Sequence, residues 1–181
     1  MRALTLWRPW PWAICRPSPR AKRVENRTWY PPEWLLGQDL AIHAGRKIDG
    51  DARSFCRSIL GETPPTDGGA EGVVAVVTIA GWRDRIGSDW RLVDVPPHDG
   101  DPWFCGPVGW LLANVRVLPT PVPCPGHQGL WNLPPDVEEQ VRRQIGNAKT
   151  EHPADCNCSR CDPPPPTAKD IAWSKFDGGV G

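Results

Sequence analysis

The sequence has no long apolar run, because none of its hydrophobic segments approaches the ~20 residues that a transmembrane helix needs. Residues 1–12 include Arg2, Arg8 and two prolines, so they also lack the apolar stretch of a signal peptide. These absences argue against a helical membrane protein and a secreted one. We therefore expect a cytoplasmic protein with no membrane partner.

The chain also has no net charge, because its 21 Lys and Arg residues balance its 21 Asp and Glu residues. This balance argues against a protein that coats nucleic acid with a uniformly basic surface. The charges are unevenly distributed, however. Residues 1–60 hold 11 Lys and Arg against 5 Asp and Glu, whereas residues 61–181 hold 10 against 16. An anionic ligand would therefore be drawn to the amino-terminal third.

Tyr and Phe are scarce, with one and three residues, whereas the chain has 11 Trp, 23 Pro and 18 Gly. Pro and Gly at this level interrupt long helices and favour short strands joined by turns. Eleven Trp exceed what a core of this size needs. We expect some of these indole rings to line a groove as flat stacking faces.

The local patterns predict a mixed α+β domain built from short elements. Residues 72–80 form the clearest strand because they are rich in β-branched side chains, and residues 110–118 alternate as a second strand. Shorter strands are predicted at 3–6 and 40–44, residues 22–29 suit a strand edge or a loop, and residues 119–125 are extended. Helices are predicted at 10–15, at 51–60 with Gly61 as the C-cap, and at 136–145.

The chain length of 181 residues suits one domain with a tail. The composition changes near residue 146, after which cysteines and four consecutive prolines follow. We therefore predict a domain at 1–145 and a tail at 146–181, with the prolines as a semi-rigid spacer. The fold class expected for the domain is a small mixed β-barrel with short flanking helices, and we expect a monomer.

A constellation of chemically suitable residues lies between positions 20 and 30. Lys22 and Arg27 can bind phosphate, and Glu25 can accept hydrogen bonds from the exocyclic amine of a base. Asn26 can bind a base edge, and Trp29 can stack on a base. The alternative is a charged strand edge, in which an exposed ion pair contributes at most about 1 kcal/mol to stability.

The same segment, Arg20–Trp29 (RAKRVENRTW), resembles the GxKxxExR signature of the activating-signal-cointegrator homology (ASCH) domain. Further segments resemble parts of that family in the order in which the family has them, and the resemblance spans about residues 3–135. These segments are LTLWRPW at 4–10, LAIHAG at 40–45, the Val-rich strand at 72–81, GPVGW at 106–110 and GHQGLW at 126–131.

The resemblance implies a PUA-like β-barrel whose helices border a cleft, with Lys22, Glu25 and Arg27 in that cleft. Members of the family are generally taken to bind RNA. Some small bacterial members are amidohydrolases that remove the acetyl group from acetylated cytidine, and a ribonuclease activity has been proposed for others. The leading Gly of the signature is Arg20 here, and the Thr nucleophile of the amidohydrolases is replaced by Glu25.

The predicted function is binding of RNA, single-stranded nucleic acid or a modified nucleoside, without a required cofactor. The predicted binding residues are Arg8, Trp10, Lys22, Glu25, Asn26, Arg27, Trp29 and Gln128. One alternative is a hydrolase acting on an acylated nucleoside, with Lys22 and Glu25 as catalytic residues: Lys22 would polarise the carbonyl and Glu25 would take a proton from water. A second alternative is an adaptor domain without enzymatic activity.

The tail contains four soft metal ligands within ten residues: His152, Cys156, Cys158 and Cys161. Three thiolates and one imidazole can complete a tetrahedral zinc site, so a structural zinc is one prediction. The alternative is a flexible tail with incidental cysteines. The odd number of cysteines, seven, with three of them close together in the tail, favours a reducing compartment over a secreted disulfide framework.

Two histidine positions complete the set of candidates. His43 ends an apolar strand, where a buried residue with a hydrogen-bond partner is the expected description and a catalytic base is the alternative. His127 and Gln128 lie in a glycine-flanked loop that closes over the predicted cleft or forms an ordinary turn.

Overall fold

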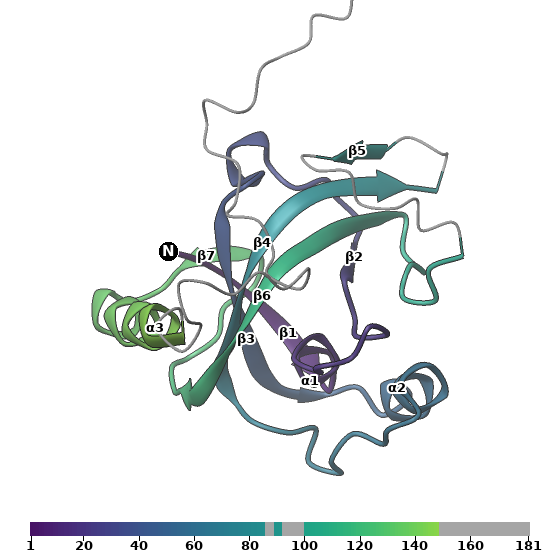
Figure 1. The fold of residues 1–181 in the computed structure, drawn as a ribbon, viewed down its shortest axis with the longest axis horizontal. Helices are drawn as coiled ribbons and strands as arrows, with labels where there is room; N and C mark the ends of the chain where they lie inside the picture. Colours follow the sequence, from purple (N-terminus) through teal and green to yellow (C-terminus); the bar gives the residue numbers. More distant parts are fainter. Residues whose placement is uncertain (86–88, 92–99, 149–181) are drawn as a thin grey trace, which may run out of the picture.

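The backbone forms one strongly curled sheet with short helices at its edges (Figure 1). The computed structural model describes residues 1–85, 89–91 and 100–148. The elements in chain order are β1 (Arg2–Arg8), α1 (Trp10–Ile14), β2 (Val24–Arg27), a 3-10 turn η1 (Glu33–Leu35), β3 (Asp39–Ile48), α2 (Ala52–Leu60), β4 (Gly72–Asp84), β5 (Asp89–Arg91), β6 (Val108–Val122), β7 (Leu130–Asn132) and α3 (Pro135–Ala148).

The strand order is β2-β6-β4-β3-β1-β7, and β5 pairs with the far end of β4. β1 and β3 run parallel, whereas the other neighbouring pairs are antiparallel. The two longest strands, β4 and β6, form the centre of the curl (Figure 1). The architecture is therefore an α+β fold with a mixed sheet curled into a half-barrel.

Each face of the sheet carries its own hydrophobic cluster, as the alternation of side chains along a strand requires. Leu4, Ile42 and Trp110 lie on the face that α1 covers. Ala3 and Ala41, one position away from the first two, lie on the opposite face, where Val137, Val141 and Ile145 of α3 pack. Trp110 is fully buried and is the largest side chain of the first cluster.

The helices α1 and α2 lie next to each other at one end of the half-barrel, on the side away from α3 (Figure 1). Trp10 of α1 meets Phe55 of α2 edge-on, with 6.0 Å between the ring centroids. Helix α2 ends at Gly61, which has a φ of 73° and donates its N–H to the carbonyl of Arg57. This confirms the C-cap predicted from the sequence.

The predicted strands and helices are present, with bounds that differ at several ends. β2 covers only Val24–Arg27, the short core of the segment that was predicted as a strand edge or loop. β6 continues to Val122, which pairs with Val73 of β4 after an irregularity in the register that follows the pair of Val117 with Ala75. β5 lies outside the strands that were predicted from the sequence. Helix α3 runs to Ala148, past the proposed boundary at residue 146.

Gly72 begins β4 in a conformation that disfavours other residues. Its φ is +94°, and a Cβ there would lie 2.5 Å from the carbonyl oxygen of Val122. We expect Gly72→Ala to lower the free energy of unfolding by about 1–3 kcal/mol because it adds both backbone strain and a backbone clash.

Gly50→Ala is the matched control, since no atom lies within 4 Å of the Cβ it would add. Urea unfolding of both variants measures the difference. Equal effects of the two substitutions would contradict the role given to Gly72.

Candidate nucleic-acid interface

Lys22, Glu25 and Arg27 form a continuous chain of ion pairs. The Lys22 Nζ lies 2.6 Å from Oε2 of Glu25, and Nη2 of Arg27 lies 3.2 Å from Oε1 of the same carboxylate. Lys22 is 3% exposed and Glu25 is 7% exposed, whereas the side chain of Arg27 is 24% exposed. The carboxylate is therefore buried between two cations, and Arg27 is the member that reaches solvent.

The strand geometry explains why these side chains converge. Glu25 and Arg27 are two residues apart on β2, so both point to the same face. Glu25 is directly opposite Trp110 in the antiparallel pair with β6, and opposite residues share a face of the sheet. Lys22 is placed just before β2 by its backbone N–H, which donates to the carbonyl of Ala13 in α1.

Several donors of this chain have no acceptor among the described residues. The ammonium of Lys22 has three N–H groups, and the structure provides two acceptors for them, the Val24 carbonyl and the Glu25 carboxylate. Arg27 has a buried Nε without a partner. Since one carboxylate faces two cations, the three groups together carry an excess positive charge that an anion can neutralise.

A cavity of about 500 Å³, here called the α2 cavity, lies next to this chain. It is lined by Trp10, Asp49, Asp51, Ala52, Ser54, Phe55, Ser58 and Cys105. The ring of Trp10 connects the two features, because its centroid lies 5.8 Å from Nζ of Lys22 while its Nε1 donates to Asp49. An ammonium at this distance from an indole is within the range of a cation–π contact.

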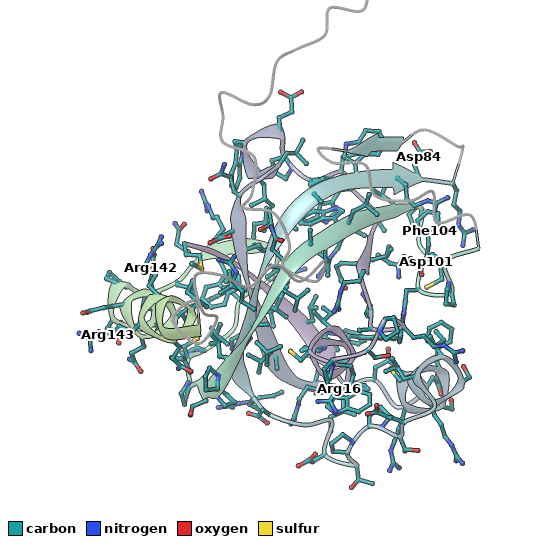
Figure 2. The ribbon with its side chains drawn as sticks, viewed as in Figure 1. Arg16, Asp84, Asp101, Phe104, Arg142 and Arg143 are labelled. Atoms are coloured by element: carbon teal, nitrogen blue, oxygen red, sulfur yellow. The ribbon has the colours of Figure 1, made fainter. Side chains whose placement is uncertain are left out.

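The loop at residues 101–106 forms another wall of the α2 cavity, and Asn26 fixes it to β2. The Asn26 amide donates to the Trp103 carbonyl and to the Cys105 sulfur, and its oxygen accepts the backbone N–H groups of Cys105 and Gly106. In Figure 2 this loop, marked by Asp101 and Phe104, lies on the same side of the molecule as α2. A base contact from Asn26 would have to replace one of these bonds.

Some of the other residues predicted to bind nucleic acid lie away from the ion-pair chain and the α2 cavity. Trp29 is 36% exposed and follows Arg27 on the same face, with its ring edge-on to Trp110 at 4.6 Å. Arg8 instead bonds to the carbonyls of Gly69 and Arg46 and pairs with Glu71. Gln128 is exposed in the loop before β7. Roles for Arg8 and Gln128 in binding stay predictions.

His43 lies in a second cavity, of about 720 Å³, on the face of the sheet that α3 shares. Its Nε2 lies 3.0 Å from the Cys124 carbonyl oxygen, and its Nδ1 is buried without a partner among the described residues. Burial lowers the pKa of His43 below its ordinary value, and the bond to the Cys124 carbonyl raises it in part. His43 is therefore a buried residue with a hydrogen-bond partner, as one of the two sequence interpretations has it.

The predicted zinc ligands His152, Cys156, Cys158 and Cys161 lie outside the described residues. Within residues 1–85, 89–91 and 100–148, no group of three or more His, Cys, Asp or Glu side chains is arranged to hold a metal ion. The structural zinc therefore stays a prediction.

Sequence analysis missed the contribution of α2 to the site. Residues 51–60 were predicted as a helix, but the pattern gave no sign that Asp51, Ser54 and Phe55 line a cavity together with Trp10 or that Phe55 contacts its ring. The density of polar residues at the start of the helix is the only signal in the sequence, and ordinary solvent exposure explains it equally well.

No protein-family model matches the chain, and a search of curated proteins finds no match. In the part of the chain that the structure describes, no helix is long and apolar enough to cross a membrane.

The lowered pKa of His43 predicts a pH-dependent stability. As the pH falls below the ordinary value of about 6.5, the unfolded chain takes up a proton that the native imidazole resists. The free energy of unfolding should therefore fall in acid, whereas above that pH His43 makes its full contribution to stability. His43→Gln should remove this component, which urea unfolding at a series of pH values measures. An unchanged pH dependence in the variant would contradict the assignment.

Cysteine reactivity should separate the exposed wall of the α2 cavity from the core. Burial raises the pKa of the Cys56 thiol to about 11, while Cys105 is exposed. We expect iodoacetamide near neutral pH to label Cys105 in the native protein and Cys56 only after unfolding, because the thiolate is the reactive form. Peptide mass spectrometry distinguishes the sites, and equal labelling rates would show that α2 does not hold Cys56 in the core.

Proposed function

We propose that this domain binds single-stranded nucleic acid, in particular RNA, through the Lys22–Glu25–Arg27 chain and the α2 cavity. The observation that carries the proposal is that Trp10, an aromatic wall of the cavity, also contacts Lys22, the first member of an ion-pair chain whose last member, Arg27, reaches solvent. Cations beside stacking rings are the common requirement of proteins that bind single strands.

Phosphate recognition is assigned to Arg27. Its side chain is 24% exposed and pairs with Glu25 through Nη2, so it is the member of the chain that a phosphate from solvent can reach. A planar guanidinium can bind a phosphate through two parallel hydrogen bonds, which Lys cannot do. Lys22 is more deeply buried, and its ammonium holds Glu25 in place while it retains one N–H for a ligand.

Base recognition is assigned to the aromatic walls. Trp10 and Phe55 both line the α2 cavity, and their rings are inclined at 68° to one another. A flat base that stacks on one ring therefore presents its edge to the other ring, which is a favourable arrangement for aromatic groups. Trp29 provides an additional partly exposed ring along the same face of the sheet.

The surroundings of Glu25 support binding over hydrolysis. Both of its carboxylate oxygens already contact a cation, Oε2 from Lys22 and Oε1 from Arg27. A general base that activates water needs an oxygen available to that water within hydrogen-bond reach. Glu25 would have to break one ion pair before it could accept a proton.

The half-barrel is proposed to be of the PUA-like type, and the chain to be an ASCH-type domain. The support is that the segments that resemble this family at residues 4–10, 20–29 and 40–45 are joined in one structural unit as β1, β2 and β3 with their flanking turns. The positions that match the signature, Lys22, Glu25 and Arg27, are the ones that form the ion-pair chain.

The test replaces Arg27 by Gln and measures binding of a short single-stranded RNA by fluorescence anisotropy at several salt concentrations. We expect about tenfold weaker binding, because a charge-assisted bond is lost. The slope of log affinity against log salt should fall by about 0.7, the value for one phosphate contact on a single strand.

Arg143→Gln is the matched control, since Arg143 is exposed on α3 at the opposite side of the molecule (Figure 2). It should leave affinity and salt slope unchanged. Failure of the wild-type chain to bind single-stranded RNA or DNA would reject the proposal. Release of acetate from acetylated cytidine that Glu25→Gln abolishes would make the domain a hydrolase instead.

A further inference from the structure

The polar groups that line the α2 cavity are almost all hydrogen-bond acceptors. Asp49 and Asp51 are carboxylates, which only accept. Ser54 donates its hydroxyl hydrogen to the carbonyl of Asp51, and Ser58 donates its own to the carbonyl of Phe55. Each hydroxyl oxygen can therefore offer a ligand only its lone pairs.

The remaining donors of the lining are already used or weak. The Nε1 of Trp10 donates to Asp49, which leaves no free indole N–H. Cys105 accepts a bond from Asn26 at its sulfur and retains only a weakly donating S–H group. A ligand group that carries its own acceptors, such as the edge of uracil, would face lone pairs on every side.

The charges that line the cavity also favour a ligand of one kind, namely a cation. Among the described residues that line it there are two aspartates and no Lys or Arg. Asp51 has no ion-pair partner within the described chain, whereas Asp49 accepts the backbone N–H groups of Asp51 and Ala52 at one oxygen and the Nε1 of Trp10 at the other. Lys22, whose Nζ lies 5.8 Å from the ring centroid of Trp10, is paired with Glu25 at 2.6 Å. A positive charge in the cavity is therefore attracted by carboxylates and by two aromatic rings.

We propose that the α2 cavity is a pocket for a nucleobase that carries both amino hydrogens and a positive charge, as adenine methylated at N1 or cytosine methylated at N3 does. This inference rests on the proposed function and specifies which base the domain selects. The base stacks on Trp10 or Phe55 through a cation–π contact, and its amino group donates to Asp51 and to the serine oxygens. The following phosphate is held by Arg27, outside the cavity.

This assignment separates phosphate binding from base recognition, two tasks that the sequence pattern assigned to the same segment. Glu25 is committed to Lys22 and Arg27, so it does not contact the base. The start of α2 takes that task, because its carboxylate and hydroxyl groups are open to the cavity. Affinity for the backbone and selectivity for the base then depend on different side chains.

The experiment compares two short single-stranded RNAs that differ at one central position, N1-methyladenosine in one and adenosine in the other. The wild-type domain should bind the methylated RNA about tenfold more tightly, as a cation–π contact beside a carboxylate predicts. Asp51→Asn keeps the shape of the side chain and removes its charge, so it should weaken binding of the methylated RNA more than binding of the unmodified RNA and reduce this ratio toward one.

Glu139→Gln is the matched control, because Glu139 is an exposed acid on α3. It should leave the ratio unchanged. Phe55→Leu is a second test of the pocket and should reduce the ratio through loss of the aromatic face. Near-ultraviolet circular dichroism establishes that each variant is folded.

Protection of Cys105 locates the bound base. The methylated RNA at saturation should slow alkylation of Cys105, which lines the cavity, and Asp51→Asn should weaken that protection. Equal affinity of the wild-type domain for the two RNAs, or a ratio that Asp51→Asn does not change, would overturn the inference. Binding of both RNAs that depends on Arg27 would then still support the proposed function, whereas no binding of either RNA would reject both.

Discussion

The buried carboxylate of Glu25 is the interaction on which the arrangement of the site depends. Removing a carboxylate and an ammonium from water costs several kcal/mol for each ion, and only close pairing and additional hydrogen bonds offset that cost. Lys22 meets this requirement with its bonds to Glu25 and to the Val24 carbonyl. Because Lys22 is also bonded through its backbone to α1, the ion pair fixes the entry of β2 against that helix.

Because side chains alternate along β2, those on one face form the ion pairs and the one on the other face holds a neighbouring loop. Glu25 and Arg27 point to the face of Trp110, where the cationic chain forms. Asn26 points the other way and fixes the loop at residues 101–106 with four hydrogen bonds to its backbone and to Cys105. One short strand thereby sets the position of the ion pairs and of a wall of the neighbouring cavity.

The strands and helices could be predicted from the sequence because their signals are local. The Val-rich run at 72–80 and the apolar spacing of 136–145 each predict one element, and both are present. The ion-pair chain was also predictable in part, since Lys22, Glu25 and Arg27 are close in sequence. The α2 cavity was not, because the contact of Trp10 with Phe55 joins residues that are distant in the chain. The contacts of Arg8 were not predictable either, because its bonds to the carbonyls of Gly69 and Arg46 join residues that are distant in the chain.

The separation of the hydrophobic clusters by the sheet has a consequence for local unfolding of the domain. Helix α3 packs on the cluster that contains Ala3, Ala41 and Val141, and the cluster around Trp110 lies on the other side of the sheet. Local opening of α3 would expose the first cluster to solvent and leave the second closed. Amide hydrogens of α3 can thus exchange without global unfolding, and the end of the half-barrel that carries α1 and α2 keeps its geometry while they do.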